Sequence, residues 1–246
     1  MIRLPSKNRV GIGIISYNRP DYLKQCLVAV DKHLKSCLIY VYDDGSEKPL
    51  SREFVPKGIH IYYGKPNKGV AKAKNWLFRK LLEKRCDYIF LLEDDIIIQS
   101  PKAVWGYIEA GKESGLHHLN FAHHGPANKG KPIEVRGKTA FYPNYVGAWS
   151  MYTAVSLKRA GLMDEHFLNA WEHVEHSFRM AKLHFTTWPL AADAKDSKLW
   201  LKEIPGSIDN SSIRPRSDWN SNKEDGYRYW EANDKDFPLK DMGVYL

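Results

Sequence analysis

The sequence predicts an α/β fold with a mixed, mostly parallel β-sheet flanked by helices. Three observations predict it: short apolar runs rich in β-branched residues, turn signals directly after them, and helical periodicity between them. Strands that alternate with helices need crossover connections, which favour parallel pairing. The pattern is clear from residue 10 to about residue 100 and becomes less regular afterwards.

The N-terminal half supplies four expected strands and two expected helices. The strands are residues 10–16 (VGIGIIS), 38–42 (LIYVY), 59–63 (IHIYY) and 88–92 (YIFLL). The helices are residues 21–33, with Asp21 as the expected cap, and residues 70–84. Ligands of such sheets bind at the carboxyl ends of strands. The turns YNRP, DDGS and EDD, which follow three of the strands, therefore mark the expected site.

The second half is expected to be less regular and to end in a loop-rich region. Helices are predicted at residues 102–113 and 170–184, strands at 119–124 and 145–153, and a polar loop or hairpin at 124–138. After Trp200 the composition becomes rich in Ser, Asn, Asp and Pro. We expect one domain over residues 1–200 and a lid or tail over 201–246 packed on it.

Composition and charge restrict the class of protein. The 246 residues, 43% hydrophobic and 27% charged, are ordinary for a soluble globular protein. No apolar run approaches the roughly 20 residues that span a bilayer, and the start lacks the apolar core of a signal peptide, so a cytoplasmic location is expected. Three scattered cysteines indicate reduced thiols. The net charge of +8 favours an anionic ligand, although a solvated surface gives the same excess.

Three carboxylates, Glu93, Asp94 and Asp95, directly follow the apolar strand at residues 88–92. Adjacent carboxylates repel one another, and none leaves water easily without a partner. Such a cluster is either solvated or holds a cation. Oxygen ligands suit Mg²⁺ or Mn²⁺, which proteins bind with one or two carboxylates together with substrate phosphates. The basic segment 68–75 (KGVAKAKN) offers charge for the same phosphates, which favours a nucleotide-like ligand.

Five motifs, in order, resemble glycosyltransferase family 2, whose members have the GT-A (Rossmann-like) fold. They are VGIGIISYNRPDYLKQCL, VYDDGS, NKGVAKAKN, LLEDDIIIQSP and WEHVEHSFRMAK, which together extend from residue 10 to residue 182. The resemblance implies a glycosyltransferase, hexosyl or pentosyl, with inversion favoured. It assigns residues 1–100 to the nucleotide sugar and 101–200 to the acceptor. Lys74 stands where arginine is usual and would reach the base or the diphosphate, and His173 replaces the usual aspartate.

The resemblance further implies a UDP-sugar as donor substrate and Mn²⁺ or Mg²⁺ as cofactor. Tyr17 would stack on the base, and Asp44 would accept a hydrogen bond from the uracil ring. Asp95 would bind the metal, with Glu93 as a second ligand, while Asp94 would hold sugar or ribose hydroxyls. The remaining expected donor contacts are Ser16, Asn18, Arg19, Asp43, Asn67 and Lys74.

A base must take the proton of the acceptor hydroxyl. Three residues of the last motif are candidates, in the order Glu172, His173, Glu175. Glu172 keeps the family's glutamate, at a helix start where a carboxylate is favoured. Histidine suits proton transfer because imidazole ordinarily titrates near neutral pH. An ordinary surface helix is the alternative reading of this segment.

The acceptor stays open at the level of sequence. A saccharide or glycoconjugate is expected first, with a lipid-linked precursor at a membrane surface, a protein, or nucleic acid with a hydroxylated base as alternatives. The nucleic-acid alternative depends on basic residues of two loops, Lys129, Lys131, Arg136, Lys138, Arg214, Arg216 and Arg228. Trp171 either stacks on a sugar or belongs to the core, and His123 or His124 is expected near the donor sugar.

Two interpretations from other classes are also kept. A nucleotidyltransferase would share the nucleotide-binding sheet and the acidic metal site, but it should carry a glycine-rich basic loop after the first strand, where this chain has YNRP. A non-catalytic nucleotide-sugar-binding module is the other, because His173 departs from the family pattern.

Overall fold

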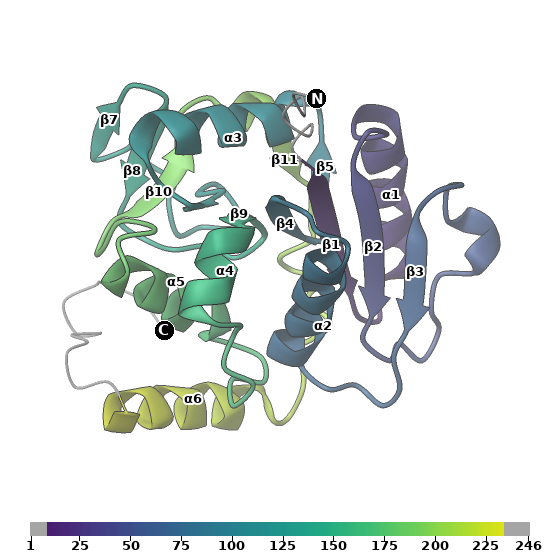
Figure 1. Cartoon of the computed structure of the whole chain (residues 1–246). Coiled ribbons are helices and arrows are strands. Elements are labelled where there is room, and N and C mark those ends of the chain that lie inside the picture. The colour runs from purple at the N-terminus through teal and green to yellow at the C-terminus, as the bar shows by residue number, and fades with distance from the viewer. Residues whose placement is uncertain (1–8, 234–246) are drawn as a thin grey trace.

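A computed structural model describes residues 9–233, and its centre is a six-stranded sheet in the order β3-β2-β1-β4-β9-β6 (Figure 1). The strands are β1 (Val10–Ser16), β2 (Leu38–Asp43), β3 (His60–Tyr63), β4 (Tyr88–Glu93), β6 (His118–Asn120) and β9 (Trp149–Thr153). β1 to β4 pair in parallel, whereas β9 is antiparallel to both of its neighbours. The expected mixed, mainly parallel sheet is confirmed.

Two small sheets and six α-helices complete the described chain. One sheet has the order β10 (Ala191–Ala194), β8 (Thr139–Tyr142), β7 (Glu134–Arg136), and the other pairs β11 (Leu201–Glu203) with β5 (Ile96–Ile98). The helices are α1 (Pro20–His33), α2 (Val70–Glu83), α3 (Lys102–Ser114), α4 (Ala154–Ala160), α5 (Glu172–Lys182) and α6 (Trp219–Asn233), with short 3-10 turns at Arg52–Phe54 and Ser197–Leu199. No helix between residues 9 and 233 is both long and apolar enough to cross a membrane.

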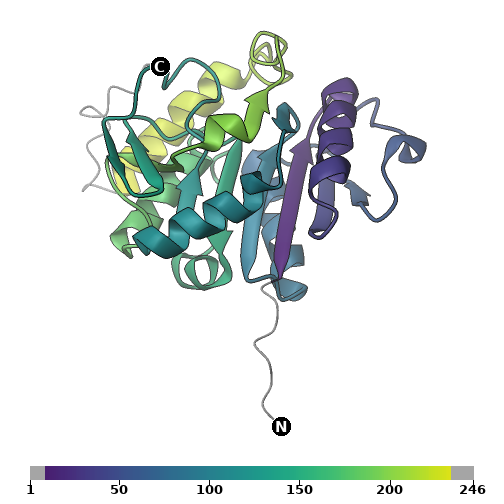
Figure 2. The ribbon, with the colours of Figure 1, turned by 90° about the horizontal axis from the view of Figure 1, so that it is seen from above.

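The helices cover both faces of the large sheet. α1 and α3 share one hydrophobic cluster with the sheet, and they lie along the same side of it in Figure 2. α2 packs on the opposite face. Alternation along β1 sends Ile12 and Ile14 to the α1 side and Gly13 to the α2 side. A Cβ on Gly13 would lie 2.9 Å from Leu77 Cβ, so the glycine lets α2 approach closely.

Strand register gathers the three polar turns at one edge of the sheet. Ser16 pairs with Asp43 across β1 and β2, and Ile15 pairs with Glu93 across β1 and β4. The turns that follow these strands therefore start at the same level. The Asp44 amide donates to the Ser16 carbonyl at 2.9 Å, which ties two of them together.

Several expected element ends were wrong. α1 begins at Pro20 with Arg19 at the cap position, so Asp21 is a first-turn residue rather than the cap. The strands expected over 119–124 and 145–153 are shorter. The segment 124–138, expected as a polar loop or hairpin, is a loop that ends in the β7–β8 hairpin. The helix expected from residue 170 starts at Glu172, because Trp171 has a left-handed backbone with φ of 73°.

The C-terminal region is more regular than its composition indicates. β11 and α6 lie in the span expected as a lid or tail; the rest of that span, residues 234–246, lies outside the described residues. α6 runs along the bottom of the view in Figure 1. Gly226 fits closely there, since a Cβ would lie 3.1 Å from Phe167 and 3.2 Å from Trp171. The Trp171 indole Nε1 donates to the Lys223 carbonyl at 3.0 Å, which fixes α6 to the start of α5.

Candidate active site

A cavity of 590 Å³ lies at the carboxyl edge of the sheet. Its volume is within the usual range for ligand sites, about 300–1,000 Å³. Among the expected site residues, its wall includes Ser16, Tyr17, Arg19, Asn67, Asp44, Glu93, Asp94, Glu172 and His173. The other expected residues, Asn18, Asp43, Lys74, Asp95 and Glu175, are not part of the wall. The fold thus brings together residues from five separate segments of the sequence.

Asp44 organises the loop that precedes α2. Its carboxylate accepts hydrogen bonds from the Lys68 amide at 3.0 Å, the Gly69 amide at 2.9 Å and Asn67 Nδ2 at 2.9 Å. Burial raises the pKa of Asp44 to about 6. A carboxylate offers roughly four acceptor positions, so one position is left for a ring N–H of a nucleobase in the cavity.

Asn18 and Asp43 hold the two polar turns in place. Asp43 accepts a hydrogen bond from the Ser46 amide at 2.8 Å. The Asn18 amide donates to the Ser46 hydroxyl at 2.7 Å, and the Asn18 side chain accepts from the Glu47 amide at 2.8 Å. These bonds position Tyr17 on the cavity wall. Asn18 and Asp43 therefore shape the site by fixing the backbone of the two turns.

The two aspartates after β4 are held by cationic and hydroxyl groups. Asp94 accepts from the Ser16 hydroxyl at 2.6 Å, and burial raises its pKa to about 7. Asp95 Oδ2 lies 3.0 Å from Arg19 Nη2 and 3.3 Å from His124 Nε2. Burial favours the neutral form of Asp95, but the hydrogen bond and charge of His124, with those of Arg19, lower its pKa overall.

The residues at this place would supply only part of the coordination shell of a divalent cation. The buried Oδ1 of Asp95 has no hydrogen-bond partner. Another carboxylate is close by, since Glu203 Oε2 lies 3.8 Å from His124 Nε2. Within residues 9–233, no group of three or more His, Cys, Asp or Glu side chains is arranged to hold a metal by itself. One carboxylate, completed by substrate phosphates and water, is a set that Mn²⁺ or Mg²⁺ accepts. Glu93, the expected second ligand, contacts Lys74 instead.

Lys74 is buried between two glutamates. Its Nζ lies 3.0 Å from Glu93 Oε1 and 3.0 Å from Glu172 Oε1, and its side chain is 1% exposed. Burial opposes the charged ammonium, but the charges of Glu172 and Glu93 raise the pKa of Lys74 overall. Lys74 is therefore a structural cation behind the cavity wall. The expected contact of Lys74 with the donor finds no support in this arrangement.

Glu172 is held as a carboxylate. Burial favours its neutral form, but the charge of Lys74, together with His173, lowers its pKa well below the usual range. A carboxylate with so low a pKa is a weak proton acceptor at neutral pH. His173 Nδ1 lies 3.4 Å from Glu172 Oε1, so Nε2 is on the opposite side of the ring. Gly147 packs on this imidazole, because a Cβ there would lie 3.0 Å from His173 Cγ.

The third candidate base lies elsewhere. Glu175 Oε2 accepts a hydrogen bond from Arg179 Nη2 at 2.9 Å, and Arg179 also donates to the carbonyls of Ala160 and Leu162. This arrangement joins α5 to the end of α4. Trp171 lines the cavity but is largely buried against α6, so it contributes mainly to the core.

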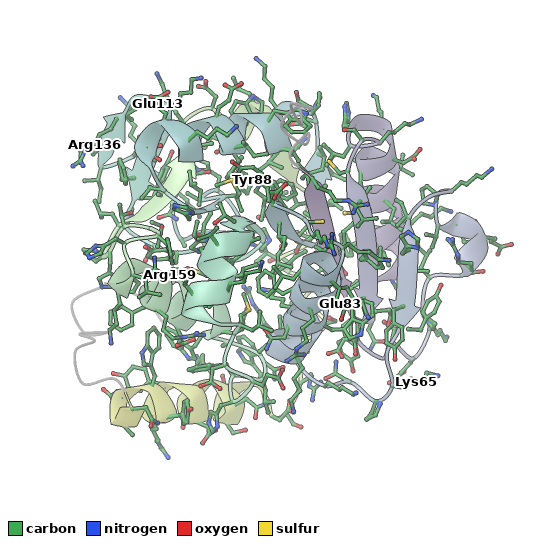
Figure 3. The ribbon with its side chains drawn as sticks, viewed as in Figure 1. Lys65, Glu83, Tyr88, Glu113, Arg136 and Arg159 are labelled. Atoms are coloured by element: carbon green, nitrogen blue, oxygen red, sulfur yellow. The ribbon has the colours of Figure 1, made fainter. Side chains whose placement is uncertain are left out.

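Most of the basic residues proposed for nucleic acid have acidic partners. The pairs are Arg136 with Glu134, Lys138 with Glu109, Arg216 with Asp218 and Arg228 with Glu224. Figure 3 shows Arg136 at the outer edge of the molecule, near β7. Arg214 and Arg216 do line the cavity. Four of these seven basic residues therefore have part of their charge balanced by a neighbouring carboxylate.

The sequence model of the family described as "Glycosyl transferase family 2" matches residues 12–112, which contain most of β1, all of β2 to β5 and most of α3. The resemblance to this family is confirmed. No curated protein sequence matches the chain.

Solved structures of glycosyltransferases share the fold. The mannosyltransferase PcManGT from Pyrobaculum calidifontis, in complex with GDP-Man and Mn²⁺, is 10% identical with a TM-score of 0.57, over 81% of this chain and 58% of that chain. S. aureus TarS 1-349 is 14% identical with a TM-score of 0.56, over 80% of this chain and 61% of that chain. The same TarS fragment in complex with UDP-GlcNAc has a TM-score of 0.51 at 14% identity, over 70% of this chain and 53% of that chain. This chain thus spans less than two thirds of each, and the likeness shows the GT-A fold.

The family 2 motifs in the sequence did not predict every residue that contributes to the cavity. His124 was expected only near the donor sugar, and its contact with Asp95 depends on the loop after β6. Lys223 follows no motif, because it belongs to α6. The only sequence signal for α6 is the spacing of Tyr227 and Trp230, and Gly226 beside them argues against a helix.

Proposed function

We propose that the chain is a glycosyltransferase that moves a sugar from a UDP-sugar to a hydroxyl of a saccharide or glycoconjugate. One observation carries the proposal: Tyr17, Asp44, Asp94 and His173 line a single cavity, although they come from four distant motifs. The family match over residues 12–112 and the printed ligands of the similar structures, GDP-Man with Mn²⁺ and UDP-GlcNAc, support a nucleotide sugar as donor.

The donor would lie along the strand ends. Uracil would stack on Tyr17 and donate its ring N–H to Asp44, and the ribose or sugar hydroxyls would meet Asp94. Asp95 would hold Mn²⁺ or Mg²⁺, with His124 beside it as a hydrogen-bond partner, and the ion would supply positive charge for the leaving diphosphate. We propose that residues 1–100 form the donor half and residues 101–200 the acceptor half, with the described part of the C-terminal segment over the cavity.

We propose His173 as the base, ahead of Glu172. The acceptor O–H would give its proton to His173 Nε2 while its oxygen bonds to the anomeric carbon. The bond between that carbon and the phosphate oxygen breaks, and the nucleoside diphosphate leaves with the electron pair. Glu172, held ionised by Lys74, would orient the imidazole and stabilise its protonated form. A single displacement with one base inverts the anomeric configuration.

The acceptor half of the wall favours a saccharide or glycoconjugate. Near His173 the wall is formed by Tyr145, Val146, Gly147 and Trp171. Aromatic and aliphatic side chains suit the C–H faces of sugar rings. The acid-paired arginines and lysines described above do not favour a polyanionic acceptor.

A donor screen tests the proposed function. The chain is incubated with UDP-, GDP-, CMP- and dTDP-sugars and Mn²⁺, and thermal shift and nucleotide release are measured. We expect a UDP-sugar to give the largest shift and to release UDP. Release of pyrophosphate from nucleoside triphosphates would instead identify a nucleotidyltransferase. Binding of a nucleotide sugar without turnover on any acceptor would favour the non-catalytic module.

A further inference from the structure

Arg19 places a guanidinium at the acidic pair. Its Nη2 lies 3.0 Å from Asp95 Oδ2, its Nε lies 3.5 Å from Asp94 Oδ1, and its side chain is 14% exposed. The guanidinium also stacks over the Tyr22 ring at 4.5 Å from the centroid. Two contacts and a stacking partner hold the side chain in one place on the cavity wall.

The contact is incomplete on both sides. The buried Arg19 Nε has no hydrogen-bond partner with good geometry, and neither has Asp95 Oδ1. Guanidinium is a planar fork that matches a carboxylate or a phosphate equally well, with two parallel N–H donors. Arg19 can therefore exchange one anion for another without moving far.

A cation bound at Asp95 would meet a positive charge already in place. Any ion that coordinates Asp95 Oδ1 or Oδ2 lies within a few ångströms of the guanidinium, because Arg19 contacts Oδ2 directly. Like charges at such a distance repel even when water screens them. The ion and Arg19 thus compete for the same carboxylate.

We propose that Arg19 is a built-in counter-cation of Asp94 and Asp95, that it competes with a divalent metal ion for Asp95, and that it binds the donor diphosphate. The proposal rests on the proposed donor site. Without metal, Arg19 neutralises the acidic pair, so a nucleoside diphosphate is bound weakly rather than repelled. With metal, the guanidinium turns from Asp95 to a phosphate oxygen.

The first arm of the test contains no donor. Mn²⁺ binding is measured by calorimetry and by electron paramagnetic resonance for the wild type, Arg19→Gln and Arg79→Gln. Arg79 is a matched control because it pairs with Glu165 at the surface and is 54% exposed. We expect Arg19→Gln to bind Mn²⁺ at least about fivefold more tightly, the effect of one unit charge at ~4 Å in bulk water. Arg79→Gln should bind as the wild type does.

The second arm measures UDP binding in chelator and in Mn²⁺. The wild type should bind UDP in both, more weakly in chelator, whereas Arg19→Gln should bind UDP only with Mn²⁺. If Arg19→Gln does not fold, Arg19→Lys replaces it. The shorter ammonium lacks the planar two-donor fork of guanidinium and should hold Asp95 less firmly, so this variant should bind Mn²⁺ more tightly than the wild type.

Three results overturn the proposal: unchanged Mn²⁺ affinity in the Arg19 variant, no Mn²⁺ binding by either protein, or UDP binding in chelator that survives Arg19→Gln. A failure of the proposed function gives a different pattern, in which no variant binds UDP or any UDP-sugar. The Mn²⁺ titration is independent of that outcome.

Discussion

Lys74 lies 3.0 Å from Glu172 and joins the first residue of α5 to the end of β4, where it also contacts Glu93. Two carboxylates and one ammonium leave this cluster, in which Lys74 and Glu172 are buried, with one net negative charge. The His173 imidazole is the next neighbour, with Nδ1 at 3.4 Å from Glu172 Oε1. The arrangement explains how Glu172 can be ionised and yet be a poor proton acceptor: Lys74 balances its charge, and its carboxylate faces the imidazole.

Replacing Lys74 should destabilise the fold strongly. Lys74→Met leaves Glu172 buried without its cation, and breaking a buried pair from one side costs about 3–5 kcal/mol. Lys72→Met is the matched control, because Lys72 is exposed on the same helix and its loss should change stability by less than about 0.5 kcal/mol. Denaturant unfolding measures both. Equal stabilities of the two variants would show that the buried pair contributes nothing.

Acid should weaken the fold through Glu172. Its pKa is lower in the folded protein than the ordinary value of 4.5, because the charge of Lys74 outweighs the effect of burial. Its contribution to stability is thus present above pH 4.5 and is lost as the pH falls below that value. We expect the free energy of unfolding to decline from about pH 5 downward, and Glu172→Gln to flatten that decline. A decline of the same slope in Glu172→Gln would assign it to other carboxylates.

Removing the imidazole should abolish most turnover. His173→Asn keeps a hydrogen-bond donor toward Glu172 but has no group that accepts a proton, so kcat should fall by about 10²–10⁴. UDP-induced thermal shift and donor KM should stay unchanged. His60→Asn is the control, since His60 is exposed on β3. If Glu172→Gln loses turnover while His173→Asn keeps it, the glutamate is the base after all.

The position of His173 should depend on Gly147. A methyl group at Gly147 would lie 3.0 Å from Cγ and 3.2 Å from Nδ1 of His173, so Gly147→Ala must displace the ring. Small displacements of a catalytic group can cost about 10²-fold in rate. We expect lower kcat with an unchanged UDP thermal shift. Gly130→Ala, where nothing lies within 4 Å of the added carbon, should leave kcat at the wild-type value.

The donor side of the fold was predictable because its signals are local. β1 and β4 are apolar runs closed by turn residues, and parallel pairing then brings their carboxyl ends to one edge. The order of the candidate bases was not predictable. It depends on which side chain Lys74 contacts, and Lys74 and Glu172 lie 98 residues apart in the sequence.

The secondary structure of the C-terminal half was harder to predict from the sequence, for a physical reason. α6 has a weakly apolar sequence, and its stability comes from Trp230 and Gly226 packing on Phe167 and Trp171. Such tertiary packing overrides a poor local propensity. The expected roles of the site residues themselves stay predictions until the variants are measured.

Asp95 should decide whether metal strengthens donor binding. Its Oδ1 is buried without a partner, so this oxygen is open to a cation whose shell a diphosphate completes. A ligand that binds only the folded state raises its stability by RT ln(1 + [L]/Kd). We therefore expect UDP to raise the melting temperature more in Mn²⁺ than in chelator.

Asp95→Asn should remove that difference and leave only the metal-free shift. The amide keeps the size of the side chain but offers one weaker oxygen and no charge. Asp21→Asn, at an exposed position in the first turn of α1, should retain the wild-type difference. If the Mn²⁺ enhancement survives in Asp95→Asn, the metal is held elsewhere. Glu203, near His124, is then the residue to change next, because its carboxylate is the closest other anion to that imidazole.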